Sequence, residues 1–288
     1  MSQVALQPFP HLVIHDALPE DEYRRLSETF PATQGLAQNQ RRNLKARVIL
    51  EAIDVAPEWR EFVRYHTSQG FAAEVRDLFV GVPGVVWGGR VVREFPHVRR
   101  IGLRPATRDG FAAQVQFHAF ADMDVAMQGS AGAETAPVGP HTDNSNKLFS
   151  CLFYMRSGDD FSDGGSLYLS RWKHPGPDWA IASARSEGRV DEARDTEVVI
   201  RVPYRSNTVV IFPNSIRAVH GVEPRQGAVT PRRFCFISLF ATNWDYTRPP
   251  FERRIKLIVG RAVRSAHAIV RRGGKSKVPA FVDTVFEA

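Results

Sequence analysis

Two residues with metal-binding side chains, His141 and Asp143, stand two positions apart in the run HTD. In an extended segment, side chains at i and i+2 lie on the same face, so both can approach one ion. A second histidine, His220, occurs in the later strand-like run AVHGVEP. Two imidazoles and one carboxylate form a ligand set that leaves three positions of Fe(II) open for oxygen chemistry. His141, Asp143 and His220 are therefore the predicted metal ligands and catalytic residues.

An HxD pair alone is a weak signal, because a histidine beside an acid is often a surface or structural pair. The order of the neighbouring motifs strengthens it. Gly139 and Pro140 introduce HTD and a strand-like run follows, then come GGSLYL, NTVVIFPN, His220 and an arginine-bearing strand, PRRFCFISLF.

In this order, HTD at 141–143, His220 and Arg233 resemble the HxD, H and R motif of the 2-oxoglutarate and Fe(II)-dependent oxygenase superfamily, in its prolyl-hydroxylase-like and phytanoyl-hydroxylase-like forms. The similarity spans roughly residues 111 to 241. It implies an α+β fold with a mainly β core, a double-stranded β-helix of the jelly-roll or cupin-like kind. It also implies Fe(II), 2-oxoglutarate and O2 as reactants, with hydroxylation of a C–H bond and release of succinate and CO2. Asp143 disfavours halogenation, because related halogenases lack this carboxylate.

The family's basic residue, on the strand after the second histidine, holds the distal carboxylate of 2-oxoglutarate, for which a guanidinium offers two parallel donors. We assign this role to Arg233. Strand alternation would place Arg233 with Cys235 and Ile237, whereas Arg232 would share the other face with the neighbouring phenylalanines, and the choice between the two arginines stays open. Arg233 follows His220 by thirteen positions, a longer spacing than is usual in the family.

Three further residues are predicted to line the cosubstrate pocket: Gln116, Lys147 and Tyr154. Each has a plainer alternative. Tyr154 would also serve as core filling of a sandwich, and Lys147 as a solvated charge at the end of a strand.

The remaining elements divide the chain into three predicted regions. Residues 1–110 form a support region, with a strand, a helix facing inward through Tyr23, Leu26 and Phe30, and two helices over 57–79. Residues 111–245 form the β core, interrupted at 173–200 by a polar surface excursion that could act as a lid. Residues 246–288 form a basic extension.

The net charge of +7 is concentrated near the C-terminus, where residues 251–277 hold nine Lys or Arg and one acid. Residues 251–272 predict a basic amphipathic helix, either packed on the fold or in peripheral contact with anionic lipid. Nucleic acid is not an expected partner, because the sequence contains no finger, RRM or helix-turn-helix signature.

Location and substrate are less closely specified. Cys151 and Cys235 lie inside apolar runs and no secretory signal is visible, which favours the cytoplasm, with peripheral attachment to the inner face of a membrane as an option. We expect a small-molecule, sugar or lipid-linked substrate. The alternatives are a metal-only cupin-like enzyme and a non-catalytic jelly-roll module that binds a glycan or a membrane. The sequence specifies neither the substrate nor the oligomeric state.

Overall fold

The computed structural model describes residues 3–31, 41–83, 85, 101–103, 119–128, 138–174, 176–186 and 191–241. The chain separates into two compact units, Met1–Thr247 and Arg248–Ala288, and every described residue belongs to the first. The predicted basic helix over 251–272 therefore lies outside the described residues. The division into regions 1–110, 111–245 and 246–288 stays a prediction.

Two mainly antiparallel sheets form the core of the first unit. The larger sheet has the order β1 (Leu12–His15), β10 (Thr208–Pro213), β6 (Lys147–Tyr154), β13 (Arg232–Ala241), β4 (Ala119–Gln128) and β2 (Arg41–Lys45), with β3 (Ile101–Leu103) parallel to β4. The smaller sheet has the order β5 (Val138–His141), β11 (Val219–Val222), β8 (Leu167–Trp172) and β9 (Thr196–Val202). A short ribbon pairs β7 (Asp163–Gly164) with β12 (Arg225–Gln226).

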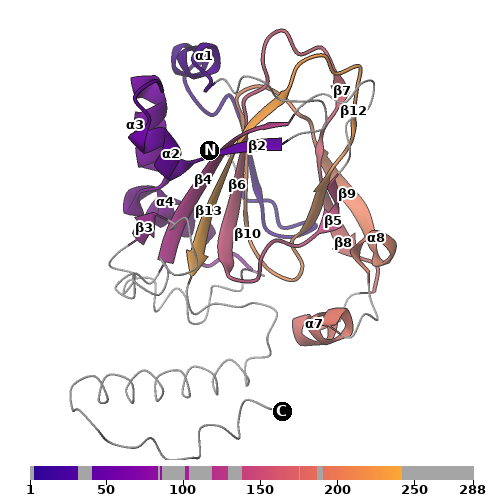
Figure 1. Cartoon of the computed structure of the whole chain (residues 1–288). Coiled ribbons are helices and arrows are strands. Elements are labelled where there is room, and N and C mark those ends of the chain that lie inside the picture. The colour runs from indigo at the N-terminus through magenta and orange to yellow at the C-terminus, as the bar shows by residue number, and fades with distance from the viewer. Residues whose placement is uncertain are drawn as a thin grey trace, which may run out of the picture. The chain divides into compact units, whose positions relative to one another are not determined.

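The chain crosses repeatedly between these sheets (Figure 1). From β4 onward it enters the larger sheet at β4, β6, β10 and β13, and the smaller sheet at β5, β8, β9 and β11. This winding is the double-stranded β-helix, which confirms the predicted fold class.

The space between the two sheets is filled from both sides by alternate strand residues. Leu152, Tyr154 and Phe234 of the larger sheet pack in one buried cluster with Leu167 and Leu169 of the smaller sheet. This inner cluster joins the two sheets into one hydrophobic core.

The opposite face of the larger sheet is covered by helices (Figure 1). They are α1 (Glu20–Glu28), α2 (Ala46–Glu51), α3 (Pro57–His66) and α4 (Gln69–Phe79). Tyr23, Leu26 and Phe30 are buried as predicted, and the Trp59 indole donates a hydrogen bond to the Leu26 carbonyl at 3.0 Å. Leu78 of α4 is 41% exposed and lines a cavity among these helices.

The segment 173–200 is only partly the surface excursion that its composition predicts. It contains the short helices α7 (Asp178–Ser186) and α8 (Glu192–Asp195), but its end, from Thr196, is strand β9. This strand pairs with β8 from Thr196 to Val202 and forms the edge of the smaller sheet, where outward-facing polar residues are expected. A lid formed by the segment stays a prediction. No helix of the described residues is both long and apolar enough to cross a membrane.

Candidate metal centre

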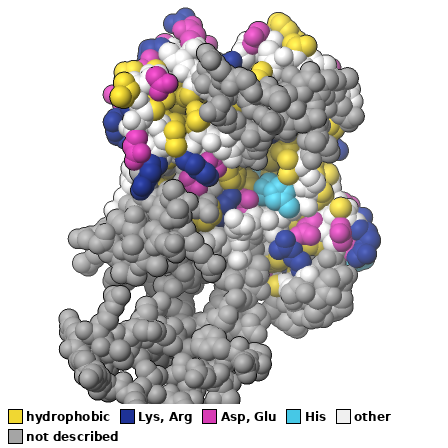
Figure 2. Space-filling model, viewed as in Figure 1, with side chains coloured by type: hydrophobic (Ala, Val, Ile, Leu, Met, Phe, Trp, Pro, Cys, Tyr) yellow, Lys and Arg dark blue, Asp and Glu magenta, His cyan; other side chains and the backbone are white. Residues whose placement is uncertain are grey.

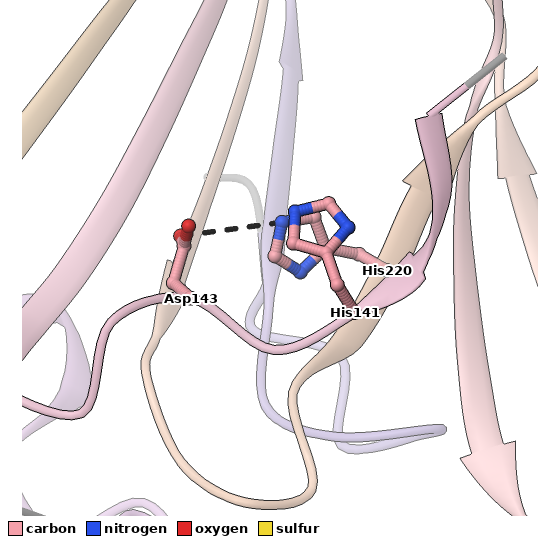
Figure 3. Close-up of side chains that lie close together, drawn as sticks. All are labelled: His141, Asp143 and His220. Carbon is pink, nitrogen blue, oxygen red and sulfur yellow. Dashed lines mark ion pairs between the residues drawn. The ribbon is translucent and has the colours of Figure 1, made fainter. Parts of the chain in front are cut away.

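The three predicted metal ligands lie together at the open end of the smaller sheet (Figure 3). Strands β5 and β11 are antiparallel neighbours, and their register sets His141 directly opposite His220. Asp143 follows in the loop after β5. One possible ligand atom from each residue lies within 4.8 Å of the other two. The site therefore brings two imidazoles and one carboxylate together from segments 77 positions apart.

Both imidazoles are oriented by backbone carbonyls. His141 Nδ1 donates to the Gly139 carbonyl at 2.8 Å, and His220 Nδ1 donates to the Ala218 carbonyl at 2.9 Å. A carbonyl oxygen only accepts, so each Nδ1 must carry the proton. This leaves the Nε2 lone pair of each ring available to a metal, the arrangement that metal-binding histidines usually have.

Asp143 is held through both carboxylate oxygens. Lys147 Nζ donates to its Oδ1 at 3.1 Å, and Ser150 Oγ donates to its Oδ2. Asn214 Nδ2 in turn donates to Ser150 Oγ at 2.9 Å. Because a carboxylate has about four lone-pair positions, these bonds fix its orientation and still leave capacity for a metal.

The protonation states also suit metal binding at neutral pH. Burial lowers the pKa of His220 to about 4, although Asp143 opposes this effect. Burial acts to raise the pKa of Asp143, but the combined effect of His220, Lys147 and Ser150 lowers it. His220 is thus neutral and Asp143 ionised, which are the forms that bind metals.

Gly221 allows β5 to lie close to β11 beside His220. A Cβ at this position would collide with the Tyr168 hydroxyl and stand 2.6 Å from the Val138 carbonyl of β5. We predict that Gly221→Ala raises the Kd for Fe(II) about tenfold or more, because β5 and His141 must move away from His220.

Gly139→Ala is the matched control, since a Cβ at Gly139 would meet nothing within 4 Å. The Kd values would be compared anaerobically by competition with a chelating dye, with circular dichroism to verify folding. Equal Kd values for the two variants would contradict the prediction.

The structure places Arg233, the predicted carboxylate clamp, on a different face of the larger sheet from Arg232, and its role in binding the cosubstrate stays a prediction. Arg233 lies on the helical side of the larger sheet, with its guanidinium 5.2 Å from the Phe30 ring and 3.5 Å from the Ser27 carbonyl. Arg232 points to the inner side, where it is 3% exposed. Its guanidinium lies 5.3 Å from the ring centre of Tyr154 and donates to the Gly165 carbonyl at 3.2 Å.

Arg232 and Tyr154 present unused polar atoms to this interior. Tyr154 Oη and Arg232 Nε are buried without hydrogen-bond partners among the described residues. Within the same part of the chain, Arg232 forms no ion pair, although a buried charge is normally paired. Burial raises the pKa of Tyr154 to about 12, so its hydroxyl stays protonated and able to donate. This pair is suited to an anion.

The other predicted pocket residues have different outcomes. Lys147 is 6% exposed and contacts Asp143, so it is not a solvated charge. Tyr154 is fully buried on the inner face. Gln116 lies outside the described residues. The sequence reading missed Ser150 and Asn214, since hydroxyl and amide side chains in apolar runs give no signal until the sheet brings them to Asp143.

On the face shown in Figure 2, a histidine side chain is visible at the surface near acidic and basic side chains. A cavity of about 90 Å³ adjoins Lys147. A larger cavity of about 620 Å³ lies against the opposite face of the larger sheet, among helices α1, α3 and α4, and no triad residue lines it. No triad residue lines the smaller cavity either, but its lining residue Lys147 donates to Asp143, which connects this cavity to the triad.

Comparisons with known proteins give similarities among solved structures. No family model and no curated protein matches the chain. A prolyl 4-hydroxylase structure from Phytophthora capsici is 16% identical, with a TM-score of 0.40, over 81% of this chain and 59% of that one. A 2OG-Fe(II) oxygenase family oxidoreductase from Burkholderia pseudomallei is 12% identical, with a TM-score of 0.42, over 83% and 87%. HygX from Streptomyces hygroscopicus, solved with nickel and 2-oxoglutarate, is 13% identical, with a TM-score of 0.40, over 82% and 84%.

Proposed function

We propose that this chain is a 2-oxoglutarate- and Fe(II)-dependent dioxygenase that hydroxylates a C–H bond of a small molecule, a sugar or a lipid-linked compound. The observation that carries the proposal is the triad of His141, Asp143 and His220, with two imidazoles fixed to leave Nε2 available and an ionised carboxylate within 4.8 Å. These groups match the two-histidine, one-carboxylate set that leaves three positions of Fe(II) open.

The inner face of the larger sheet supports binding of the cosubstrate. Arg232 supplies a buried guanidinium that forms no ion pair within the described residues, and Tyr154 supplies a protonated hydroxyl. Tyr154 lies four residues along β6 from Ser150, the neighbour of Asp143, a separation of about 13 Å between Cα atoms. A short dicarboxylate such as 2-oxoglutarate could lie along this face, with one carboxylate near the triad and the other at Arg232.

Each group of the chain has a specific task in the proposed reaction. His141, His220 and Asp143 hold the metal, and Arg232 and Tyr154 orient the distal carboxylate. Leu152 and Phe212, both buried, exclude water from the wall between these two ends. When bound, Fe(II) and 2-oxoglutarate would activate O2, one oxygen atom of which would enter succinate as 2-oxoglutarate loses CO2 and the other the C–H bond of the substrate.

The proposal is tested by loading the protein anaerobically with Fe(II), adding 2-oxoglutarate and recording the visible charge-transfer band of the chelate. We expect a band in the wild type and none in His141→Ala. His174→Ala is the matched control, because His174 is exposed, and it should retain the band. Iron binding without a band would reject the 2-oxoglutarate proposal in favour of the metal-only enzyme. Absence of iron binding would favour the non-catalytic module.

A further inference from the structure

Polar side chains make up most of the lining of the 90 Å³ cavity next to the triad, and of these only Lys147 bonds a triad residue among the described residues. The residues lining the cavity are Asp122, Asp124, Asn144, Lys147, Phe236, Ser238 and Phe240. At about 30 Å³ for each water of the liquid, this volume holds about three waters, or one functional group of a larger molecule. It is therefore large enough to hold one polar group of a larger molecule.

The cross-strand register connects this cavity to the metal centre. Ser150, which donates to Asp143, stands opposite Ser238 on β13, and Ser238 stands opposite Asp122 on β4. Paired residues of neighbouring strands share a face, and adjacent strands are about 4.8 Å apart. The carboxylates of β4 thus lie about 10 Å across the inner face from the residue that supports the metal ligand.

The cavity contains an unused polar group of its own. Ser238 is 2% exposed, and its Oγ has no hydrogen-bond partner among the described residues. Burying a hydroxyl without a partner is unfavourable unless a ligand supplies one. Ser238 lies on β13, between Ser150 of β6 and Asp122 of β4.

The remaining lining groups favour a positively charged ligand. Asp122 and Asp124 are 7% and 9% exposed, and both carboxylates face the ammonium of Lys45, so this site accommodates a donor. Lys45 shows that an ammonium fits between them, with Nζ at 3.4 Å from Asp122 Oδ2 and 2.7 Å from Asp124 Oδ1. The Lys45 side chain is 49% exposed and can swing towards solvent.

The aromatic wall points to the same chemistry. Lys147 Nζ lies 4.1 Å from the ring centre of Phe236 and 5.6 Å from that of Phe240, at the metal end of the cavity. Aromatic faces attract ammonium groups, and this lysine shows that the rings are accessible to one. The Lys147 ammonium also donates a hydrogen bond to Asp143, so its positive charge is paired with the carboxylate of the triad.

We propose that Asp122, Asp124 and Ser238 bind an ammonium group of the substrate, so that the enzyme oxidises a C–H bond of a molecule that carries a primary amine. This inference rests on the proposed function. The ammonium would lie between the two carboxylates, either in place of the Lys45 ammonium or beside it. It would donate a hydrogen bond to Ser238 Oγ, which would fix its orientation. Anionic substrates would be repelled by the same pair.

The test uses glucosamine and tyramine, each of which has one amine, and each is paired with its N-acetylated form, which lacks the positive charge. Binding to the anaerobic protein loaded with Fe(II) and 2-oxoglutarate is measured by calorimetry, and succinate formation is then measured in air. We expect at least one amine to bind about tenfold or more tightly than its acetylated partner, the scale of a lost charge-assisted hydrogen bond. That amine should also raise succinate formation.

Variants locate the effect. Asp122→Asn and Asp124→Asn should each weaken amine binding about tenfold, whereas exposed Asp54→Asn should not. Ser238→Ala should weaken amine binding without lowering stability, because its hydroxyl has no partner to lose within the described residues. Equal binding of acetylated forms, unchanged binding in both aspartate variants, or no binding by any amine would overturn the inference. Absence of the charge-transfer band in wild type would instead reject the proposed function.

Discussion

Replacing Arg232 by methionine is expected to raise the Kd for 2-oxoglutarate by at least about thirtyfold. The substitution keeps much of the apolar stem of the side chain and removes the guanidinium that we assign to the distal carboxylate. Losing one partner of a buried, hydrogen-bonded charge pair costs about 2 to 5 kcal/mol, and each 1.4 kcal/mol is about tenfold in Kd. The Kd would be measured anaerobically from the charge-transfer band as 2-oxoglutarate is added.

Arg233→Met is the matched control, one residue away on the same strand. Its guanidinium faces Phe30 and the Ser27 carbonyl on the helical side, so we expect its Kd to remain within about threefold of wild type. The Kd for Fe(II) should be unchanged in both variants, because neither arginine contacts the triad within the described residues. A large loss of 2-oxoglutarate binding in Arg233→Met alone would restore the assignment that the sequence suggested.

The sequence predicts that successive side chains of β13 point to opposite faces of the larger sheet. It does not predict which of the two sets faces the smaller sheet. Arg232, Phe234 and Phe236 point one way, and Arg233, Cys235 and Ile237 the other, as period-two spacing requires. Both faces of this central strand are buried, one by the smaller sheet and one by helices. Each side therefore reads as apolar, and hydrophobicity cannot distinguish the side that meets the cosubstrate.

The metal triad was more accessible to sequence reasoning, because HTD is a local motif and His220 is in a recognisable strand. The amine subsite was not. Asp122 and Ser238 become neighbours through the β4–β13 register, and Lys45 reaches them from β2. These contacts depend on strand pairings between distant segments, which no local pattern records.

Removing the carboxylate of Asp160 is expected to cost about 3 to 5 kcal/mol of unfolding free energy, the usual penalty for leaving a buried partner charge uncompensated. Asp160 and Arg225 have side chains only 1% exposed, and Arg225 Nη1 donates to Asp160 Oδ2 at 2.8 Å. Ser162 also donates to Asp160 Oδ1, through its hydroxyl at 2.6 Å and its amide at 3.1 Å.

This cluster has a consequence for the cosubstrate pocket. Arg225 lies on β12, which pairs with β7. Gly165, the residue that follows β7, has the carbonyl to which the Arg232 guanidinium donates. A Cβ at Gly165 would stand 2.7 Å from Arg225 Cγ, so the arginine packs directly against this backbone. Loss of Asp160 should therefore loosen Arg232 as well as lower stability, and 2-oxoglutarate binding should weaken in the variant even at temperatures where it is folded.

Urea unfolding of Asp160→Ala at neutral pH would measure the loss, with Asp159→Ala as control because that neighbouring carboxylate is exposed. The control should stay within about 0.5 kcal/mol of wild type. The double variant Asp160→Ala with Arg225→Met should be more stable than Asp160→Ala alone, since it removes the stranded guanidinium. If the double variant were instead less stable by the sum of two independent losses, the two side chains would not act as a pair, and the stability of this region would derive from packing of the Arg225 stem against Gly165 and Tyr204.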